Sequence, residues 1–253
     1  MGGMHWRAGI LFLLVASLVG CAHAPPRNPL AQWVPSLNHG PRKPILIVLH
    51  ATTQDSVRES LHTLRTRNSG GPVSAHYLIG KDGARYQLVS DELRAWHAGP
   101  GRWGTITDVN SASIGIELDN DGESDYPRAQ IESLVRLLED ICTRNAIPRT
   151  QVIAHADMAP ERRSDPGKRF PWKLLFDSGF GIWPATEAGE PPTGFDAWLA
   201  LHAIGYPLHD RAAAVRAFHL RFRGIDADTL DEADARILYA LTAGIPGASR
   251  DSP

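Results

Sequence analysis

Cysteine is scarce in this sequence. Its 253 residues contain only Cys21 and Cys142, which excludes a framework of several disulfides and a zinc site built from paired cysteines. A His-Glu-x-x-His segment, the helical signature of many zinc proteases, is absent. No Gly-x-Ser-x-Gly elbow precedes a helix, so a serine hydrolase of that type is not indicated. Cys142 falls on the apolar side of an expected helix, which predicts a buried thiol.

An excess of charge of one sign is lacking as well. The formal net charge is −2, and removal of residues 1–20, whose one charged side chain is Arg7, changes it to −3. A balance so close to neutral predicts no nucleic-acid partner. Beyond residue 20, no segment is long and apolar enough to cross a bilayer. The length and the 43% hydrophobic content suit one large globular domain with a smaller one.

The N-terminus has the order of features found in an export signal. A short start that ends with Arg7 is followed by an apolar run over residues 8–19 and by Gly20-Cys21. This resembles a bacterial lipoprotein signal, which is cut before a cysteine whose thiol then receives a lipid. The alternative is an ordinary secretory signal with an accidental cysteine. Because Ala22 and not aspartate follows, the resemblance implies a periplasmic protein that is lipid-anchored to the outer membrane through Cys21.

Residues 21–43 are rich in Pro, Asn, Ser and Gly, and they predict a tether. From residue 44 to about 183, expected strands and helices alternate, which predicts an α/β fold with a central mixed β-sheet flanked by helices. The expected strands are 45–49, 77–79, 86–89, 113–119 and 151–154, and the expected helices begin at Ser56 and near Ile131.

A Pro-, Glu- and Gly-rich stretch over residues 184–194 predicts a linker. Residues 195–246 then show three short helical patterns, which predict a small C-terminal three-helix domain. Thr229 and Glu232 have the spacing of a capping box for the third helix.

Two histidines stand where strands end. His50 follows the apolar run of residues 45–49, His155 follows residues 151–154, and Asp165 comes ten residues after His155. Strand ends of an α/β sheet commonly carry ligands, and a catalytic zinc takes three protein ligands and keeps one open position. Position alone does not select this trio, because His62, His76 and His97 are also available.

Five ordered blocks resemble the zinc-dependent type-2 N-acetylmuramoyl-L-alanine amidases, the family related to phage T7 lysozyme and the peptidoglycan recognition proteins. They are Ile47-Val-Leu-His50-Ala-Thr, Ser74-Ala-His-Tyr-Leu-Ile79, Ala95-Trp-His-Ala-Gly99, Ser113-Ile-Gly-Ile-Glu117 and His155-Ala-Asp-Met-Ala-Pro-Glu-Arg-Arg-Ser-Asp165-Pro-Gly. The resemblance covers residues 44–183. It implies one zinc ion per chain, held by His50, His155 and Asp165, and hydrolysis of the amide between N-acetylmuramic acid and L-alanine in peptidoglycan or muropeptides.

The same resemblance implies roles for other residues. Glu117 falls on the acidic catalytic position, where it would move a proton between the attacking water and the leaving nitrogen. Arg163 stands where this subgroup usually has lysine, and it would stabilise the oxyanion. His97, Trp96, His76 and Asn110 are the candidate substrate contacts.

Residues 195–246 resemble, more loosely, the three-helix peptidoglycan-binding module that is often fused to such amidases. A plain helical cap is the alternative for this region. For the whole chain, the alternative to an enzyme is a non-catalytic peptidoglycan-binding protein of the same fold. The sequence leaves the oligomeric state open, as well as the choice between intact wall and soluble fragments.

Overall fold

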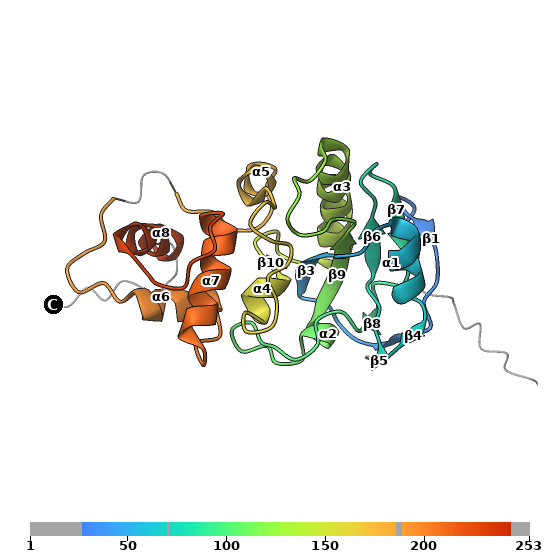
Figure 1. Ribbon diagram of the computed structural model, residues 1–253, viewed down its shortest axis with the longest axis horizontal. Helices are drawn as coiled ribbons and strands as arrows, with labels where there is room; N and C mark the ends of the chain where they lie inside the picture. Colours follow the sequence, from blue (N-terminus) through green and yellow to red (C-terminus); the bar gives the residue numbers. More distant parts are fainter. Residues whose placement is uncertain (1–26, 70, 186–188, 244–253) are drawn as a thin grey trace, which may run out of the picture.

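The computed structural model describes residues 27–69, 71–185 and 189–243, and a six-stranded sheet forms its centre (Figure 1). The order across the sheet is β1-β7-β6-β9-β3-β10. β6, β9, β3 and β10 run parallel, and β7 is antiparallel to β6, so the sheet is mixed as predicted. The bounds of its strands are Gln32–Trp33 (β1), Leu46–Ala51 (β3), Tyr77–Ile79 (β6), Arg85–Gln87 (β7), Ser113–Leu118 (β9) and Val152–Ala154 (β10).

Alternate residues of β6 face opposite sides of the sheet, and each side has its own helix. Tyr77 and Ile79 belong to the main core with the apolar face of α3 (Arg128–Asn145). Leu78 belongs to a smaller core, against which Val57 and Leu61 of α1 (Val57–Thr63) pack. The sheet is therefore covered by helices on both faces.

Several local features follow directly from the sequence. The side chain of Ser56 caps α1 by accepting a hydrogen bond from the backbone N–H of Glu59, as its position predicts. The β6–β7 hairpin turns where Lys81-Asp82-Gly83 was expected to turn, and Gly83 has a φ of 84°, which glycine adopts without strain. The remaining short elements of this region are β2 (His39–Pro41), β4 (Arg67–Asn68), β5 (Gly71–Pro72), β8 (Leu93–Ala95), α2 (Val109–Ala112), α4 (His155–Met158) and α5 (Trp172–Asp177).

The predicted tether is wrong for the part that the structure describes. β1 pairs with β7 in the main sheet, and β2 pairs with β8. Residues 28–43 are thus an integral part of the fold. Their Pro- and Asn-rich composition resembles that of a linker, because short edge strands tolerate proline and contain few apolar residues. The predicted signal peptide and Cys21 lie outside the described residues.

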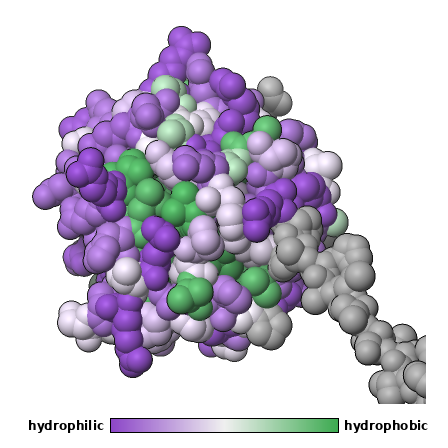
Figure 2. All heavy atoms as spheres, turned by 90° about the vertical axis from the view of Figure 1, so that its right-hand side faces the viewer, coloured by the Kyte–Doolittle hydropathy of each residue, from purple (hydrophilic) through white to green (hydrophobic). Residues whose placement is uncertain are grey.

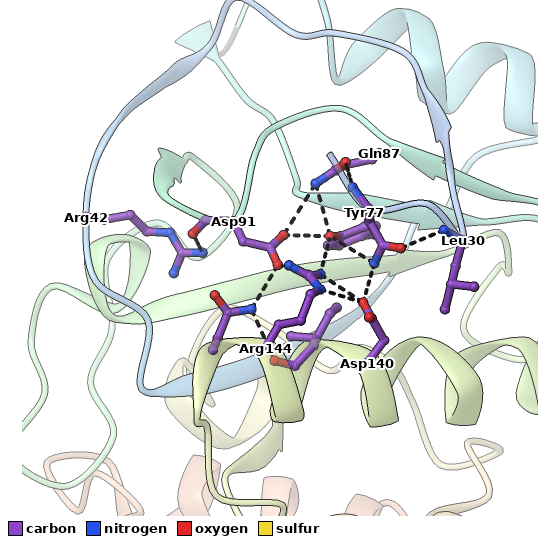
Figure 3. A network of polar contacts seen from close by, with 10 residues as sticks. Leu30, Arg42, Tyr77, Gln87, Asp91, Asp140 and Arg144 are labelled. Carbon is purple, nitrogen blue, oxygen red and sulfur yellow. Dashed lines mark hydrogen bonds and ion pairs between the residues drawn. The ribbon is translucent and has the colours of Figure 1, made fainter. Parts of the chain in front are cut away.

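A buried polar network holds the start of this segment in place (Figure 3). The backbone N–H of Asn28 donates to Gln87 Oε1 at 2.9 Å, and its side-chain amide donates to Asp140 Oδ2 at 2.6 Å. Arg144 lies 2.9 Å from both Asp140 and Asp91, so one positive charge is shared by the two carboxylates. The network therefore joins the N-terminal segment, the sheet and α3.

Three helices follow residues 184–194, as predicted: α6 (Ala197–Ile204), α7 (Arg211–Phe222) and α8 (Glu232–Thr242). The expected cap of α8 is wrong, because Asp231 is the N-cap and forms a capping box with Asp234. Leu201 and Phe218 of these helices belong to the same buried core as the sheet. In Figure 1, α7 lies beside α4, so the helices pack on the sheet domain.

Among the described residues, no helix combines the length and hydropathy that a membrane crossing requires. The end of the molecule near β1 and α1 is mostly hydrophilic, with small separate apolar areas (Figure 2). Scattered areas of this kind are normal on protein surfaces and indicate no particular partner.

Candidate metal centre

Three parallel strands bring three functional side chains to one edge of the sheet. His50 lies near the end of β3 and is the register partner of Glu117 in β9. Val152–Ala154 of β10 runs beside residues 47–49 of β3, so His155 emerges at the same edge as the first residue of α4. Parallel pairing of the strands therefore brings His50 and His155 together, although they are 105 residues apart in the sequence.

His50, His155 and Asp165 meet at this edge. The Nδ1 atoms of the two histidines are 2.9 Å apart, and Asp165 Oδ2 lies 3.1 Å from His155 Nδ1 and 3.3 Å from His50 Nδ1. Both histidines are almost fully buried, and Asp165 is partly exposed. The structure thus brings His50 and His155 together with Asp165, whereas position in the sequence alone could not distinguish these two histidines from the others.

The second nitrogen of His155 determines where its proton lies. His155 Nε2 is 3.0 Å from the backbone carbonyl of Ala98, which can only accept a hydrogen bond. Nε2 therefore carries the proton, and in a neutral ring Nδ1 presents a lone pair towards Asp165.

A longer chain of hydrogen bonds determines which ring nitrogen of His50 carries the proton. The Ser113 hydroxyl donates to the carbonyl of Val109 at 2.5 Å and so accepts from His97 Nε2 at 3.3 Å. His97 Nδ1 is then an acceptor for His50 Nε2 at 3.0 Å, which leaves the His50 Nδ1 lone pair free. Burial, together with the neighbouring His155, lowers the pKa of His50 to about 4, which agrees with a neutral ring.

Three acceptor atoms consequently face one another at 2.9–3.3 Å. Lone pairs and a carboxylate placed so close repel one another unless a cation lies between them. Tetrahedral coordination at about 2.0–2.1 Å would separate ligand atoms by about 3.3 Å, so these residues fit one metal ion. Metal-binding imidazoles are usually held in place by a hydrogen bond from their second ring nitrogen, as both histidines are here.

The trio lies in a cleft of about 270 Å³ that Glu117, Arg163, Trp96 and His97 also line. The pKa of Glu117 is raised to about 8, mainly by burial and to a smaller extent by the negative charge of Asp165. The positive charge of Arg163 lowers it and offsets part of this rise. A carboxyl group with a raised pKa is suited to both accepting and donating a proton near neutral pH.

The two adjacent arginines differ in their surroundings. Arg162 Nε donates to the carbonyl of Pro100 at 2.7 Å, and its Nη2 donates to the carbonyl of Ala98, which also holds His155. The Arg163 side chain makes no hydrogen bond or ion pair within the described residues, and it lines the cleft. Sequence reasoning missed Arg162, because a backbone carbonyl as a partner leaves no pattern in the sequence.

The four predicted substrate contacts have different positions. Trp96 and His97 line the cleft, so contact with a substrate stays a prediction for them, although His97 also supports His50. Asn110 Oδ1 accepts from the backbone N–H groups of His97 and Ala98 and so holds that loop. His76 is fully buried, with its ring nitrogens bonded to Leu93 and Gly115. It is not available to a substrate, so the predicted substrate contact of His76 is wrong.

Comparisons with known proteins agree with this geometry. The profile of the N-acetylmuramoyl-L-alanine amidase family matches residues 40–168. The N-acetylmuramoyl-L-alanine amidase AmiD of Escherichia coli (strain K12) is 35% identical, over 72% of this chain and 76% of the relative.

Two solved structures are similar along most of the chain. One is AmiD from E. coli in complex with the substrate anhydro-N-acetylmuramic acid-L-Ala-D-gamma-Glu-L-Lys, with a TM-score of 0.70, 33% identity and coverage of 81% of this chain and 90% of that one. The other is AmpDh3 from Pseudomonas aeruginosa in complex with anhydromuramic pentapeptide, with a TM-score of 0.70, 33% identity and coverage of 80% and 92%.

Proposed function

This chain belongs to the N-acetylmuramoyl-L-alanine amidase family, and we propose that it cleaves the amide between N-acetylmuramic acid and L-alanine with one zinc ion held by His50, His155 and Asp165. The observation that carries the zinc proposal is the convergence of three acceptor atoms, two of them on imidazoles anchored through their second nitrogen. Two imidazoles and a carboxylate are a known ligand set of catalytic zinc.

The residues around the metal centre divide the chemistry between them. Zinc, when bound, supplies a Lewis acid that activates water and polarises the amide carbonyl. Glu117 accepts the proton of the attacking water and returns it to the leaving nitrogen, because its carboxyl group lines the same cleft. The Arg163 guanidinium stabilises the negative charge that develops on the carbonyl oxygen.

For the substrate, we propose peptidoglycan fragments that carry N-acetylmuramic acid or its anhydro form. The two similar structures contain anhydro-N-acetylmuramic acid linked to the tripeptide L-Ala-D-gamma-Glu-L-Lys, and an anhydromuramic pentapeptide, respectively. The open cleft beside Trp96 and His97 offers an aromatic wall on which a sugar ring can pack.

The experiment that tests this function identifies the bond that is cut. Protein without residues 1–21 is incubated with purified sacculi and, separately, with anhydro-muropeptides, and the products are analysed by mass spectrometry. We expect free stem peptides, loss of activity after treatment with a chelator, and recovery when zinc is added.

A non-catalytic peptidoglycan-binding protein is the alternative function. In that case the zinc-loaded protein would sediment with sacculi and release no stem peptide. The presence of all three ligand residues and of Glu117 favours the enzyme, because binding alone does not need a proton carrier in the cleft.

We further propose that Cys21 carries a lipid that holds the protein at the periplasmic face of the outer membrane. Metabolic labelling of cells with an alkyne fatty acid should label the parent protein and place it in the outer-membrane fraction. Cys21→Ser should remove the label. Cys142→Ser is the matched control and should keep it, since Cys142 is buried. A label that persists in Cys21→Ser would refute the anchor.

A further inference from the structure

A buried carboxylate lies directly behind the metal ligand His155. Asp157 is fully buried, and its Oδ2 accepts a hydrogen bond at 2.8 Å from the backbone N–H of Ala154, the residue before His155. This bond closes the first turn of α4, which begins with His155. The orientation of the His155 backbone therefore depends on where the Asp157 carboxylate is held.

Two residues of the C-terminal domain hold that carboxylate. The Tyr206 hydroxyl donates to Asp157 Oδ1 at 2.7 Å, and Arg221 Nη1 donates to Asp157 Oδ2. Tyr206 and Arg221 are themselves buried. Burial of a carboxylate is unfavourable unless it is paired and hydrogen-bonded, and within the described residues Arg221 is the cation that contacts it.

Arg221 also holds the strand that leads to His155. Its Nη2 donates to the carbonyl of Val152 in β10 at 3.1 Å, and its guanidinium lies 4.3 Å from the centre of the Trp172 ring. One side chain of α7 thus contacts both the strand before His155 and the turn after it.

The same domain also supports the loop that follows the cleft residues Trp96 and His97. Trp103 packs edge to face against Tyr206, with ring centres 5.3 Å apart, and the N–H of Gly104 donates to the carbonyl of Gly205 at 2.8 Å. A Cβ at Gly205 would lie 2.7 Å from the Trp103 ring, so only glycine permits this contact. The loop that continues from Trp96 and His97 therefore rests on the C-terminal helices.

We propose that the C-terminal helical domain is a structural part of the metal centre, and that Arg221 and Tyr206 are positioning residues for His155, acting through Asp157. This inference rests on the proposed metal site. It gives the domain a role that does not require it to bind peptidoglycan as a separate module.

Zinc affinity is the test, because it can be measured without activity. Zinc dissociation constants of the full-length mature chain are determined by chelator competition, well below the melting temperature of each variant. Tyr206→Phe removes one hydroxyl, and Arg221→Lys keeps the charge but loses the two-pronged contact. Each should weaken zinc binding by about 10-fold, the lower end of the effect of residues that support metal ligands.

Arg223→Lys is the matched control. Arg223 lies two residues further on and pairs with Asp231 and Asp234 inside the C-terminal domain. Arg223→Lys should lower the melting temperature without changing the zinc dissociation constant. If Tyr206→Phe and Arg221→Lys also lower only the melting temperature, the positioning role is refuted. If the parent protein itself binds no zinc, the metal site fails, and the proposal fails with it.

Discussion

Glu117→Gln should lower kcat/KM by about 10²–10⁴-fold, the usual contribution of a general acid–base, while zinc stays bound. Gln has the size of Glu but cannot accept the proton of the attacking water. Glu117 is not a member of the His50–His155–Asp165 group, so its replacement leaves the ligand atoms unchanged. Turnover is measured on anhydro-muropeptide, and zinc content by metal analysis of the same preparation.

Two further measurements make this result specific to Glu117. The rise of kcat/KM with pH that accompanies loss of the Glu117 proton should disappear in the variant, because only the ionised carboxylate is a base. Glu123→Gln is the control, since Glu123 is an exposed carboxylate that pairs with Lys168, and it should have normal activity. Near-normal turnover of Glu117→Gln would assign the proton transfer to another group.

Arg163→Ala should lower kcat by about 10²–10³-fold, the typical effect of removing one oxyanion donor, with a smaller change in KM. The Arg163 side chain lines the cleft and has no partner within the described residues, so it is available to the developing charge. Its neighbour Arg162 is held by the carbonyls of Pro100 and Ala98 and cannot replace it without releasing that loop.

Arg163→Lys and Arg169→Ala complete this experiment. Lysine keeps a positive charge at this position, so Arg163→Lys should recover most of the activity. Arg169, an exposed arginine that pairs with Asp125, should be replaceable without loss. An unchanged kcat in Arg163→Ala would mean that the oxyanion is stabilised by the metal alone.

The central fold and the candidate ligand trio could be predicted from the sequence. An apolar run such as residues 45–49 predicts a strand buried on both faces, and the histidines that follow two such runs meet once the strands are parallel. The family resemblance then identified which histidines and which aspartate to choose. Hydrophobic periodicity and short ordered motifs are local properties of the sequence, so these features can be predicted without a structure.

The tertiary structure decided what depends on distant partners. Residues 28–43 resembled a tether because the pairing of β1 and β2 with β7 and β8 has no local signature. Likewise, Ala98 holds His155 from 57 residues away, and Arg221 reaches Asp157 across 64 residues.

By itself, therefore, the sequence predicted the class of fold, the candidate metal ligands and the bond to be cut. Only the tertiary structure decided which nitrogen of each histidine faces the proposed metal position, and that the C-terminal helices pack behind the site. The physical reason is that single hydrogen bonds and ion pairs between remote residues, several of them to backbone carbonyls, impose no periodicity on the chain.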